Sequence, residues 1–266
     1  MSCIARQSVV FLIKYMTITL GSRTRECWDG LLDLVYPPLC VLCDNKLVSA
    51  GERATRLCAA CSRQIKKIRP PYCVMCGRSL QGHTENVDRC WECCGRRCHY
   101  DRSWSCALYE GTLREAIHRF KYSGKVSLLD LFSGLLSNFL AENSGVHSGM
   151  DAVIAVPLHS TKLREREFNQ AQALAAVVAK QLRIIDASRC IRRSRPTRAQ
   201  NELDRNQRFK NVRGAFAVAD PRLVNGKNVL IVDDLYTTGA TLDECGRVLR
   251  AAGAQRIHCI TVARGA

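Results

Sequence analysis

The chain has 266 residues, of which 47% are hydrophobic and 24% are charged. This is the composition of an ordinary globular protein, with room for one large domain or two modest ones. Forty Lys and Arg against 24 Asp and Glu give a formal net charge of +16. That excess favours anionic partners such as phosphates or nucleic acid, and the alternative is a basic surface with no particular partner.

The N-terminal segment shows neither a membrane span nor a clean secretory signal. Its longest apolar run, residues 9–13, is interrupted by Lys14 and is far too short to cross a bilayer. No small-residue cleavage site follows it cleanly. We therefore expect a cytoplasmic protein whose thiols stay reduced. Residues 1–30 resemble no later element, and we expect them to be a poorly ordered extension.

The cysteines divide the chain into two parts. Thirteen of the 16 lie at or before Cys106, and only three follow it. We expect a small cysteine-rich domain over residues 31–105 and a second domain over residues 106–266. The unpaired cysteines are expected to be small buried hydrophobes: Cys3, Cys27, Cys106, Cys190, Cys245 and Cys259.

Four C-x-x-C pairs lie in the cysteine-rich part. They are Cys40/Cys43, Cys58/Cys61, Cys73/Cys76 and Cys90/Cys93. Two thiolates separated by two residues in a tight turn can face one ion, and a second such turn completes a tetrahedron. Consecutive pairs, 14 and 13 residues apart, therefore predict one or two structural zinc sites. The zinc would stabilise a segment with little core of its own.

Several alternatives to this pairing remain open. Four thiolates also hold iron–sulfur clusters, although these need no regular paired turns, and redox C-x-x-C usually occurs once. Cross-braced pairing, first with third and second with fourth, also remains open. Cys94, Cys98 and His99 lie close enough to replace ligands of the second site.

Aromatic residues lie among arginines in the same part of the chain. Tyr72, Trp91 and Trp104 are near Arg89, Arg96, Arg97 and Arg102. Aromatic faces beside cations would suit single-stranded DNA, and the competing interpretation is ordinary core aromatics.

Beyond Cys106 the pattern changes to alternating helices and strands. Amphipathic periodicity predicts helices over residues 113–120, 126–142, 169–182 and 241–252. Short apolar runs predict buried strands over residues 151–157, 228–232 and 257–263. Strands that alternate with helices predict an α/β fold with a parallel sheet flanked by helices. Residues 189–213 form a basic, polar stretch.

The strongest local signal is the segment 229–241. Four apolar residues form a strand, and Asp233 and Asp234 follow at its C-terminal end, where α/β sheets bind ligands. The next five residues, Thr237, Thr238, Gly239, Ala240 and Thr241, open a helix. Their amides and hydroxyls can surround a phosphate at the positive end of the helix dipole. The carboxylates suit two ribose hydroxyls, directly or through Mg²⁺.

The competing interpretation is a structural turn in which Asp and Thr cap a helix. The full length of the motif favours the phosphate site. No G-x-G-x-x-G and no G-x-x-x-x-G-K-[ST] occurs in the chain, which removes support for dinucleotide and Walker-type sites.

Residues 229–241 resemble the phosphoribosyl pyrophosphate (PRPP) motif of type I phosphoribosyltransferases. From about residue 31 to the end, the chain resembles the ComF family of competence-associated proteins, which combine a double zinc ribbon with such a domain. The landmarks are YPPLCVLC (36–43), LCAAC (57–61), YCVMCG (72–77), YEGTLREAIHRFKYSG (109–124), VPLH (156–159), REREFNQAQ (164–172), NVRGAF (211–216) and VDDLYTTGAT (232–241).

The resemblance implies further site residues. Val156, Pro157 and Leu158 would face pyrophosphate, and Arg164, Arg166 and Asn169 would lie on a mobile hood above it. A second basic segment would contribute Arg195, Arg208 and Asn211.

Two residues of the hood region bear on activity. Glu167 stands where family members usually have glycine, and a carboxylate there would oppose pyrophosphate or restrict the loop. His159 is the nearest candidate for a general base.

Three functions follow from the resemblance. The first is a factor in DNA uptake during natural transformation, which handles incoming single strands or a partner enzyme and binds PRPP or a 5-phosphoribosyl group with Mg²⁺. The second is a metabolic phosphoribosyltransferase that transfers ribose 5-phosphate from PRPP to a base or an amine. The third is a binding module without catalysis. We expect an enzyme, a pentosyl transferase, with Asp233 and Asp234 as catalytic residues.

Overall fold

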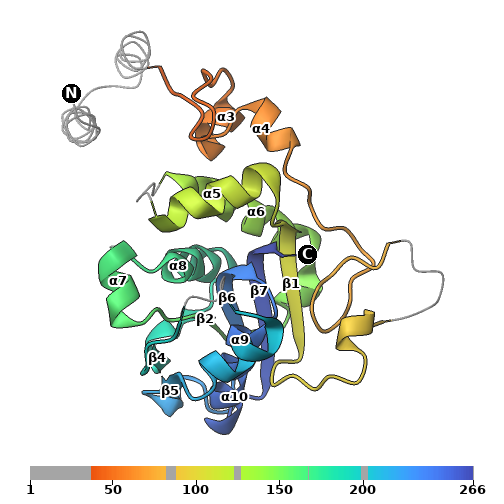
Figure 1. Ribbon diagram of the computed structural model, residues 1–266, viewed down its shortest axis with the longest axis vertical. Coiled ribbons are helices and arrows are strands. Elements are labelled where there is room, and N and C mark those ends of the chain that lie inside the picture. The colour runs from red at the N-terminus through yellow and green to blue at the C-terminus, as the bar shows by residue number, and fades with distance from the viewer. Residues whose placement is uncertain (1–36, 82–87, 123–126, 167, 199–202, 266) are drawn as a thin grey trace.

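The structure is a computed structural model that describes residues 37–81, 88–122, 127–166, 168–198 and 203–265. The extension predicted for residues 1–30 lies outside this range. Figure 1 shows a twisted sheet with helices on its faces, and the cysteine-rich segment along one side of it and above it. Among the described residues, no helix has the length and apolarity that crossing a membrane requires.

The sheet has five parallel strands in the order β1-β7-β6-β2-β3. Their bounds are β1 Arg102–Leu108, β2 Ala152–Ala155, β3 Ile185–Asp186, β6 Asn228–Tyr236 and β7 Arg256–Arg264. The central strands are buried on both faces, which explains their continuous apolar sequence. The α/β parallel sheet predicted from the sequence is confirmed.

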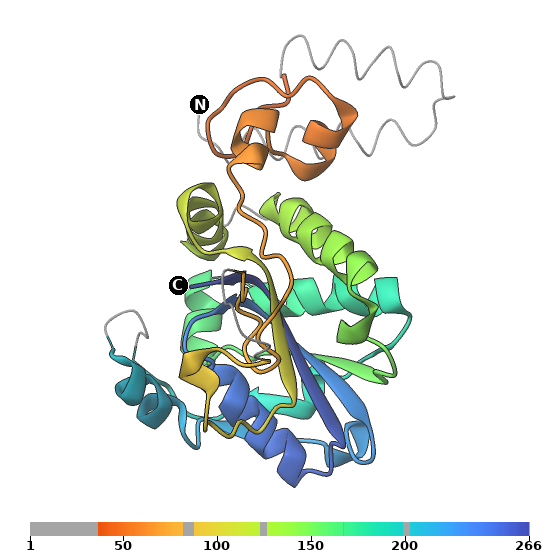
Figure 2. The ribbon, with the colours of Figure 1, turned by 90° about the vertical axis from the view of Figure 1, so that its right-hand side faces the viewer.

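Helices cover both faces of the sheet. Helix α8 (Gln170–Leu182) lies on β2 and β6, and α6 (Leu128–Glu142) lies beside it on the same face (Figure 2). Helix α10 (Ala240–Ala251) covers the opposite face, next to α9 (Arg205–Val212). Helix α5 (Gly111–Tyr122) crosses above the sheet, and the short α7 (Ser160–Arg166) follows β2.

The four predicted helices correspond to α5, α6, α8 and α10, and the three predicted strands to β2, β6 and β7. Most predicted bounds differ from the observed ones by one or two residues, but the end of the strand predicted over residues 228–232 is wrong by four. Strand β6 does not end at Val232 but runs to Tyr236, because its pairing with β7 continues through Asp233↔Thr261 to Tyr236↔Arg264. The two carboxylates therefore stand within the strand.

Several elements were not predicted. Strand β1 forms an edge of the sheet and begins at Arg102, N-terminal to the expected domain boundary at 105/106. The basic stretch 189–213 and the residues after it contain α9 and a small antiparallel sheet of β4 (Ile191–Arg193) and β5 (Phe216–Val218).

The cysteine-rich segment has little regular structure. It contains α3 (Ala50–Thr55), α4 (Ala59–Arg63) and the 3-10 turn η2 (Trp91–Cys93). Isolated bridges close its turns at Leu39↔Lys46 and Tyr72↔Ser79. The first half lies over α5 and α6, whereas the second half runs along β1 towards α10 (Figure 2).

Candidate functional site

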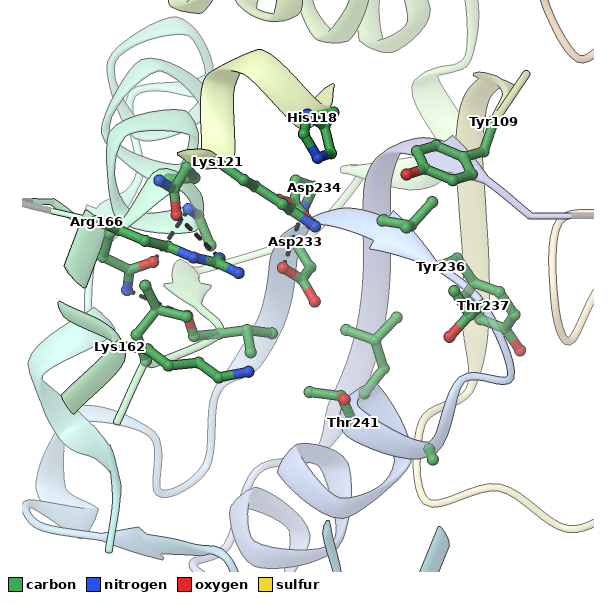
Figure 3. A pocket seen from close by; sticks show the side chains of 18 of the residues that line it. Tyr109, His118, Lys121, Lys162, Arg166, Asp233, Asp234, Tyr236, Thr237 and Thr241 are labelled. Atoms are coloured by element: carbon green, nitrogen blue, oxygen red, sulfur yellow. Dashed lines mark hydrogen bonds and ion pairs between the residues drawn. The ribbon is translucent and has the colours of Figure 1, made fainter. Parts of the chain in front are cut away.

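A cavity of about 970 Å³ lies above the C-terminal ends of β2 and β6. Helix α5 forms one wall, α7 and the start of α8 another, and the turn from β6 into α10 a third (Figure 3). This is the position at which open α/β sheets bind ligands.

The turn from β6 into α10 has the geometry of an anion-binding loop. Gly239 is the N-cap residue of α10 and has φ 77°. A Cβ atom at Gly239 would lie 2.4 Å from the Tyr236 hydroxyl oxygen, so the turn requires glycine. Thr237, Gly239, Ala240 and Thr241 line the cavity, and α10 directs its N-terminal amides to the same place.

The carboxylates of Asp233 and Asp234 have different surroundings, because successive residues of a strand face opposite ways. Asp234 is buried and forms an ion pair with Lys121, whose Nζ is 2.9 Å from its Oδ1. Asp233 is half-buried and points into the cavity, where its Oδ1 accepts the N–H of Asp234 at 2.9 Å (Figure 3).

This difference appears in the acidity of Asp233. Removal from water, together with the neighbouring Asp234 charge, raises the pKa of Asp233 to about 7. Lys121 and Arg193 only partly offset these effects. Asp233 is therefore a carboxylate at the cavity surface that would accept a cation.

A basic wall faces the carboxylates. The lining includes Lys121, Lys162, Arg166, Arg193 and Arg208. Burial would by itself lower the pKa of Lys121, but the ion pair with Asp234 raises it above its ordinary value. Burial and the charges of Arg166 and Arg193 lower the pKa of Lys162. Cations that repel one another around one space favour a ligand with several negative charges.

Asn169 and Arg166 hold together the cavity wall that α7 and the start of α8 form. Asn169 is the N-cap of α8, accepts the Ala171 N–H at 3.1 Å and donates to the Val156 carbonyl oxygen at 3.2 Å. Arg166 lies over the Tyr122 ring, 5.2 Å from its centroid. Asn169 thus connects the start of α8 to the loop after β2, and Arg166 connects α7 to α5.

The structure brings most of the predicted site residues together. The cavity lining contains Asp233, Asp234, Thr237, Gly239, Ala240, Thr241, Val156, Leu158, Arg166, Asn169 and Arg208. The lining does not contain Pro157, Thr238, Arg164, Arg195 or Asn211. Glu167 lies outside the described residues, and His159 bonds Thr161 instead of lining the cavity.

Sequence reasoning missed several residues of the site. Lys121 and His118 come from α5, Lys162 from α7 and Arg193 from β4. The motif YEGTLREAIHRFKYSG contains His118 and Lys121, and its resemblance to the family was the only signal that could have identified them. Nothing local in the sequence pairs Lys121 with Asp234.

The paired cysteines form two compact clusters. One comprises Cys40, Cys43, Cys58 and Cys61, the other Cys73, Cys76, Cys90 and Cys93, with the sulfurs of each cluster within 4.8 Å of one another. The Sγ–Sγ distances of 3.6 Å for Cys43–Cys58 and 3.7 Å for Cys76–Cys90 match the edge of a tetrahedron with Zn–S bonds of about 2.3 Å.

The pKa shifts of the thiols also indicate that each cluster holds a metal ion. Hydrogen bonds from Cys76 and Cys93 lower the pKa of Cys73, whereas hydrogen bonding to Cys73 raises the pKa of Cys93. Four thiols this close cannot all ionise unless a cation neutralises them. The donor set fits structural zinc, with all four positions supplied by the protein.

The clusters confirm consecutive pairing and rule out the cross-braced arrangement. Cys94, Cys98 and His99 belong to neither described cluster. Cys106, Cys190, Cys245 and Cys259 are buried, as expected, whereas Cys3 and Cys27 lie outside the described residues.

The three aromatic residues of this part have different surroundings. Trp104 is a core residue that packs against His258, and Tyr72 packs against Phe139. Trp91 is 75% exposed.

Fold and site together define a double zinc ribbon joined to a phosphoribosyltransferase-type domain. Residues 168–266 match the family described as "Phosphoribosyl transferase domain", and residues 31–99 match the "Double zinc ribbon domain".

Named relatives share this chain's sequence over much of its length. The DNA utilization protein YhgH of Shigella flexneri is 30% identical over 161 residues, which cover 60% of this chain and 70% of that protein. Competence protein F of Haemophilus influenzae is 29% identical over 151 residues, which cover 56% and 66%. A solved glutamine PRPP amidotransferase from B. subtilis matches with 22% identity and a TM-score of 0.36, over 53% of this chain and 30% of that one. The chain belongs to the ComF family, which contains YhgH and competence protein F.

The clusters predict the zinc content. The purified chain should carry two zinc ions, and Cys43→Ser should reduce this to about one, because one of four thiolate ligands is lost. Cys94→Ser is the matched control, since Cys94 is exposed beside the second cluster. Elemental analysis of each variant measures the effect. A loss of one zinc from the Cys94→Ser protein would contradict the ligand assignment.

The raised pKa of Asp233 predicts that the stability of the ligand-free protein depends on pH. Since its folded pKa of about 7 exceeds the ordinary aspartate value of 3.8, the native state loses stability as pH rises from about 4 to 7, and the full penalty is present above pH 7. Asp233→Asn should therefore stabilise the ligand-free protein by about 1–3 kcal/mol at pH 8 and by almost nothing near pH 4. Urea unfolding at both pH values measures this, and destabilisation at pH 8 would contradict it.

Proposed function

We propose that the cavity binds a 5-phosphoribosyl group, as PRPP or a related compound, together with Mg²⁺, and that the protein acts in the use of DNA taken up by the cell. One observation supports this ligand: Asp233, which makes no ion pair within the described part of the chain, faces a basic wall beside the loop at the N-terminus of α10. A sugar that bears a phosphate and a pyrophosphate, bound with a divalent cation, has the complementary charges.

Each part of the cavity suits one part of such a ligand. The loop amides and hydroxyls of residues 237–241 suit the 5-phosphate. Asp233 suits the ribose hydroxyls or Mg²⁺, a hard cation that prefers carboxylate oxygens. The basic residues Lys121, Lys162 and Arg166 suit the pyrophosphate, next to Val156 and the loop that follows it.

The same arrangement supports a transfer reaction. When the bond between the anomeric carbon and pyrophosphate breaks, the ribose gains positive character and the leaving group gains negative charge. Asp233 would stabilise the ribose, and the basic wall would stabilise the leaving pyrophosphate. Asp234, held by Lys121, would keep Asp233 in position through its backbone N–H. The acceptor would be a base or an amine that enters beside Tyr109 and His118.

The link to DNA rests on the relatives and on charge. The named relatives are a DNA utilization protein and a competence protein. The net charge of +16 supports a polyanionic partner. Trp91 is exposed near Arg89 and Arg97, also exposed, and supplies a stacking face of the kind that single strands use.

A ligand-induced thermal shift tests the proposed pocket. PRPP with Mg²⁺ at about 100 times its Kd should raise the Tm by several degrees, since such binding adds about 2.7 kcal/mol of stability. Asp233→Asn should abolish most of the shift. Asp130→Asn is the matched control, because Asp130 is exposed on α6 and makes the same charge change away from the cavity. The absence of a shift in the unmodified chain would refute the pocket.

Two further measurements separate the possible roles. Pyrophosphate release with candidate bases or amines would support transfer, whereas binding without release would reduce the site to a binding module. Single-stranded DNA binding that survives Asp233→Asn, falls steeply with salt and weakens with Trp91→Ala would support DNA handling. If no such binding occurs at low salt, the DNA role would have to act through a protein partner.

A further inference from the structure

The segment that follows the second cysteine cluster (Cys73, Cys76, Cys90 and Cys93) touches the loop of residues 237–241, called the phosphate loop below. Arg96, three residues after the ligand Cys93, donates from Nη1 to the carbonyl oxygen of Thr238 at 3.1 Å. Thr238 lies at the centre of the loop, between the cavity-lining Thr237 and Gly239. A bond from a cationic guanidinium is stronger than a neutral one, so Arg96 fixes the direction in which this peptide group points.

The residues that follow Arg96 lie against α10. The His99 N–H donates to Asp243 Oδ1 at 2.7 Å, in the first turn of the helix. A Cβ at Gly246 would come within 3.0 Å of the His99 carbonyl carbon, which shows how closely the segment approaches the helix. The segment after the second cluster therefore holds the helix that begins at the phosphate loop.

A third connection begins at a metal ligand itself. Arg264 donates from Nη1 to the carbonyl oxygen of Cys76 at 2.6 Å, and its guanidinium lies 4.6 Å from the centroid of the Tyr236 ring. The Tyr236 hydroxyl is 3.0 Å from that of Tyr100. Both tyrosines are buried, and their hydroxyl oxygens lie 2.4 Å (Tyr236) and 3.1 Å (Tyr100) from the place that a Cβ at Gly239 would take.

The same cluster also supports α9, whose Arg208 lines the cavity. The guanidinium of Arg96 lies over Phe209, 4.7 Å from the ring centroid, and Glu92 in η2 pairs with Arg205 at 3.2 Å. Two parts of the cavity, the phosphate loop and α9, are thus attached to one zinc ribbon.

The first cluster has a different position. Its Val41 carbonyl oxygen accepts from Arg119 of α5 at 2.7 Å, and α3 lies on α6. These contacts attach the first cluster to α5 and α6, on the side away from the phosphate loop (Figure 1).

We propose that the second zinc ribbon is a working part of the ligand cavity and that Arg96 and Tyr100 are positioning residues for the phosphate loop. Metal in the second cluster holds residues 96–100 in place, and these residues hold the loop amides in their binding orientation before the ligand arrives. Loss of this order makes binding weaker, because the ligand must then order the loop. The ligand is that of the proposed function; the ordering of the loop does not depend on the ligand's identity.

Arg96→Gln in the full chain tests the positioning role without removing a zinc ligand. Hydrogen exchange of the ligand-free protein should be about tenfold or more faster over residues 236–244, because one charged hydrogen bond is lost. Exchange in β7 and a zinc content of two should stay unchanged. Arg97→Gln is the matched control, since Arg97 is exposed and carries the same charge. Unchanged hydrogen exchange over residues 236–244, or faster exchange throughout β7, overturns the proposal.

Binding by the same variants gives the second readout. The Kd for ribose 5-phosphate, which carries the phosphate assigned to this loop, should rise about tenfold or more in Arg96→Gln and stay within twofold in Arg97→Gln. If the unmodified chain binds neither ribose 5-phosphate nor PRPP, the proposed function fails, and the exchange measurement still decides the positioning role.

The metal dependence is tested by one substitution in each cluster. Cys93→Ser should speed exchange over residues 236–244, and Cys43→Ser, with the same loss of one thiolate, should leave it unchanged. Equal effects of the two substitutions on the loop would overturn the dependence on the second cluster. If Cys93→Ser does not fold, the Arg96→Gln result decides the proposal alone.

Discussion

The carboxylate of Asp233 is removed from water beside the charge of Asp234, near the C-terminal end of a buried parallel strand, and the rest of the cavity is arranged around this carboxylate. Asp234 is neutralised by Lys121 at 2.9 Å, whereas Asp233 makes no ion pair with any residue that the structure describes, and its pKa is raised to about 7. Burial of an unpaired carboxylate costs free energy in the ligand-free protein. A bound cation, or a transition state with positive charge, would recover this free energy, and strongly perturbed carboxylates are typical of functional sites.

The surrounding charges separate into two groups. The carboxylates lie on β6, whereas the cations come from α5, α7 and other elements far away in the sequence. A loop of amides at the N-terminus of α10 lines the cavity on the other side of the carboxylates from Arg166 and Lys162 (Figure 3). This separation of charge suits a ligand that combines a divalent cation, sugar hydroxyls and phosphates. The zinc ribbons add a second level of order, because one of them contacts the loop directly through Arg96.

The sequence identified features that depend on short segments. The C-x-x-C pairs, the apolar strands and the loop at residues 237–241 are each local, and the structure contains all of them. It could not identify Lys121, because 113 residues separate it from Asp234 and only the fold brings the two together. The extension of β6 to Tyr236 was missed for a similar reason: pairing with β7 overrides the low strand propensity of two aspartates. Strand β1 was missed because Ser103 and Ser105 interrupt its apolar run, although both serines are buried in the structure.

The proposed ligand site depends on the ionisation of Asp233. Carbon-13 NMR of labelled aspartate carboxyls measures this ionisation directly, and the Asp233→Asn variant assigns the signal. In the ligand-free protein the Asp233 carboxyl should titrate near pH 7. Saturation with Mg²⁺ and PRPP should move its midpoint to well below that value, because the charged form then has a partner. A ligand-free midpoint near that of an ordinary aspartate, or a midpoint that Mg²⁺ and PRPP leave unchanged, would contradict the role of Asp233 as the carboxylate that accepts the cation.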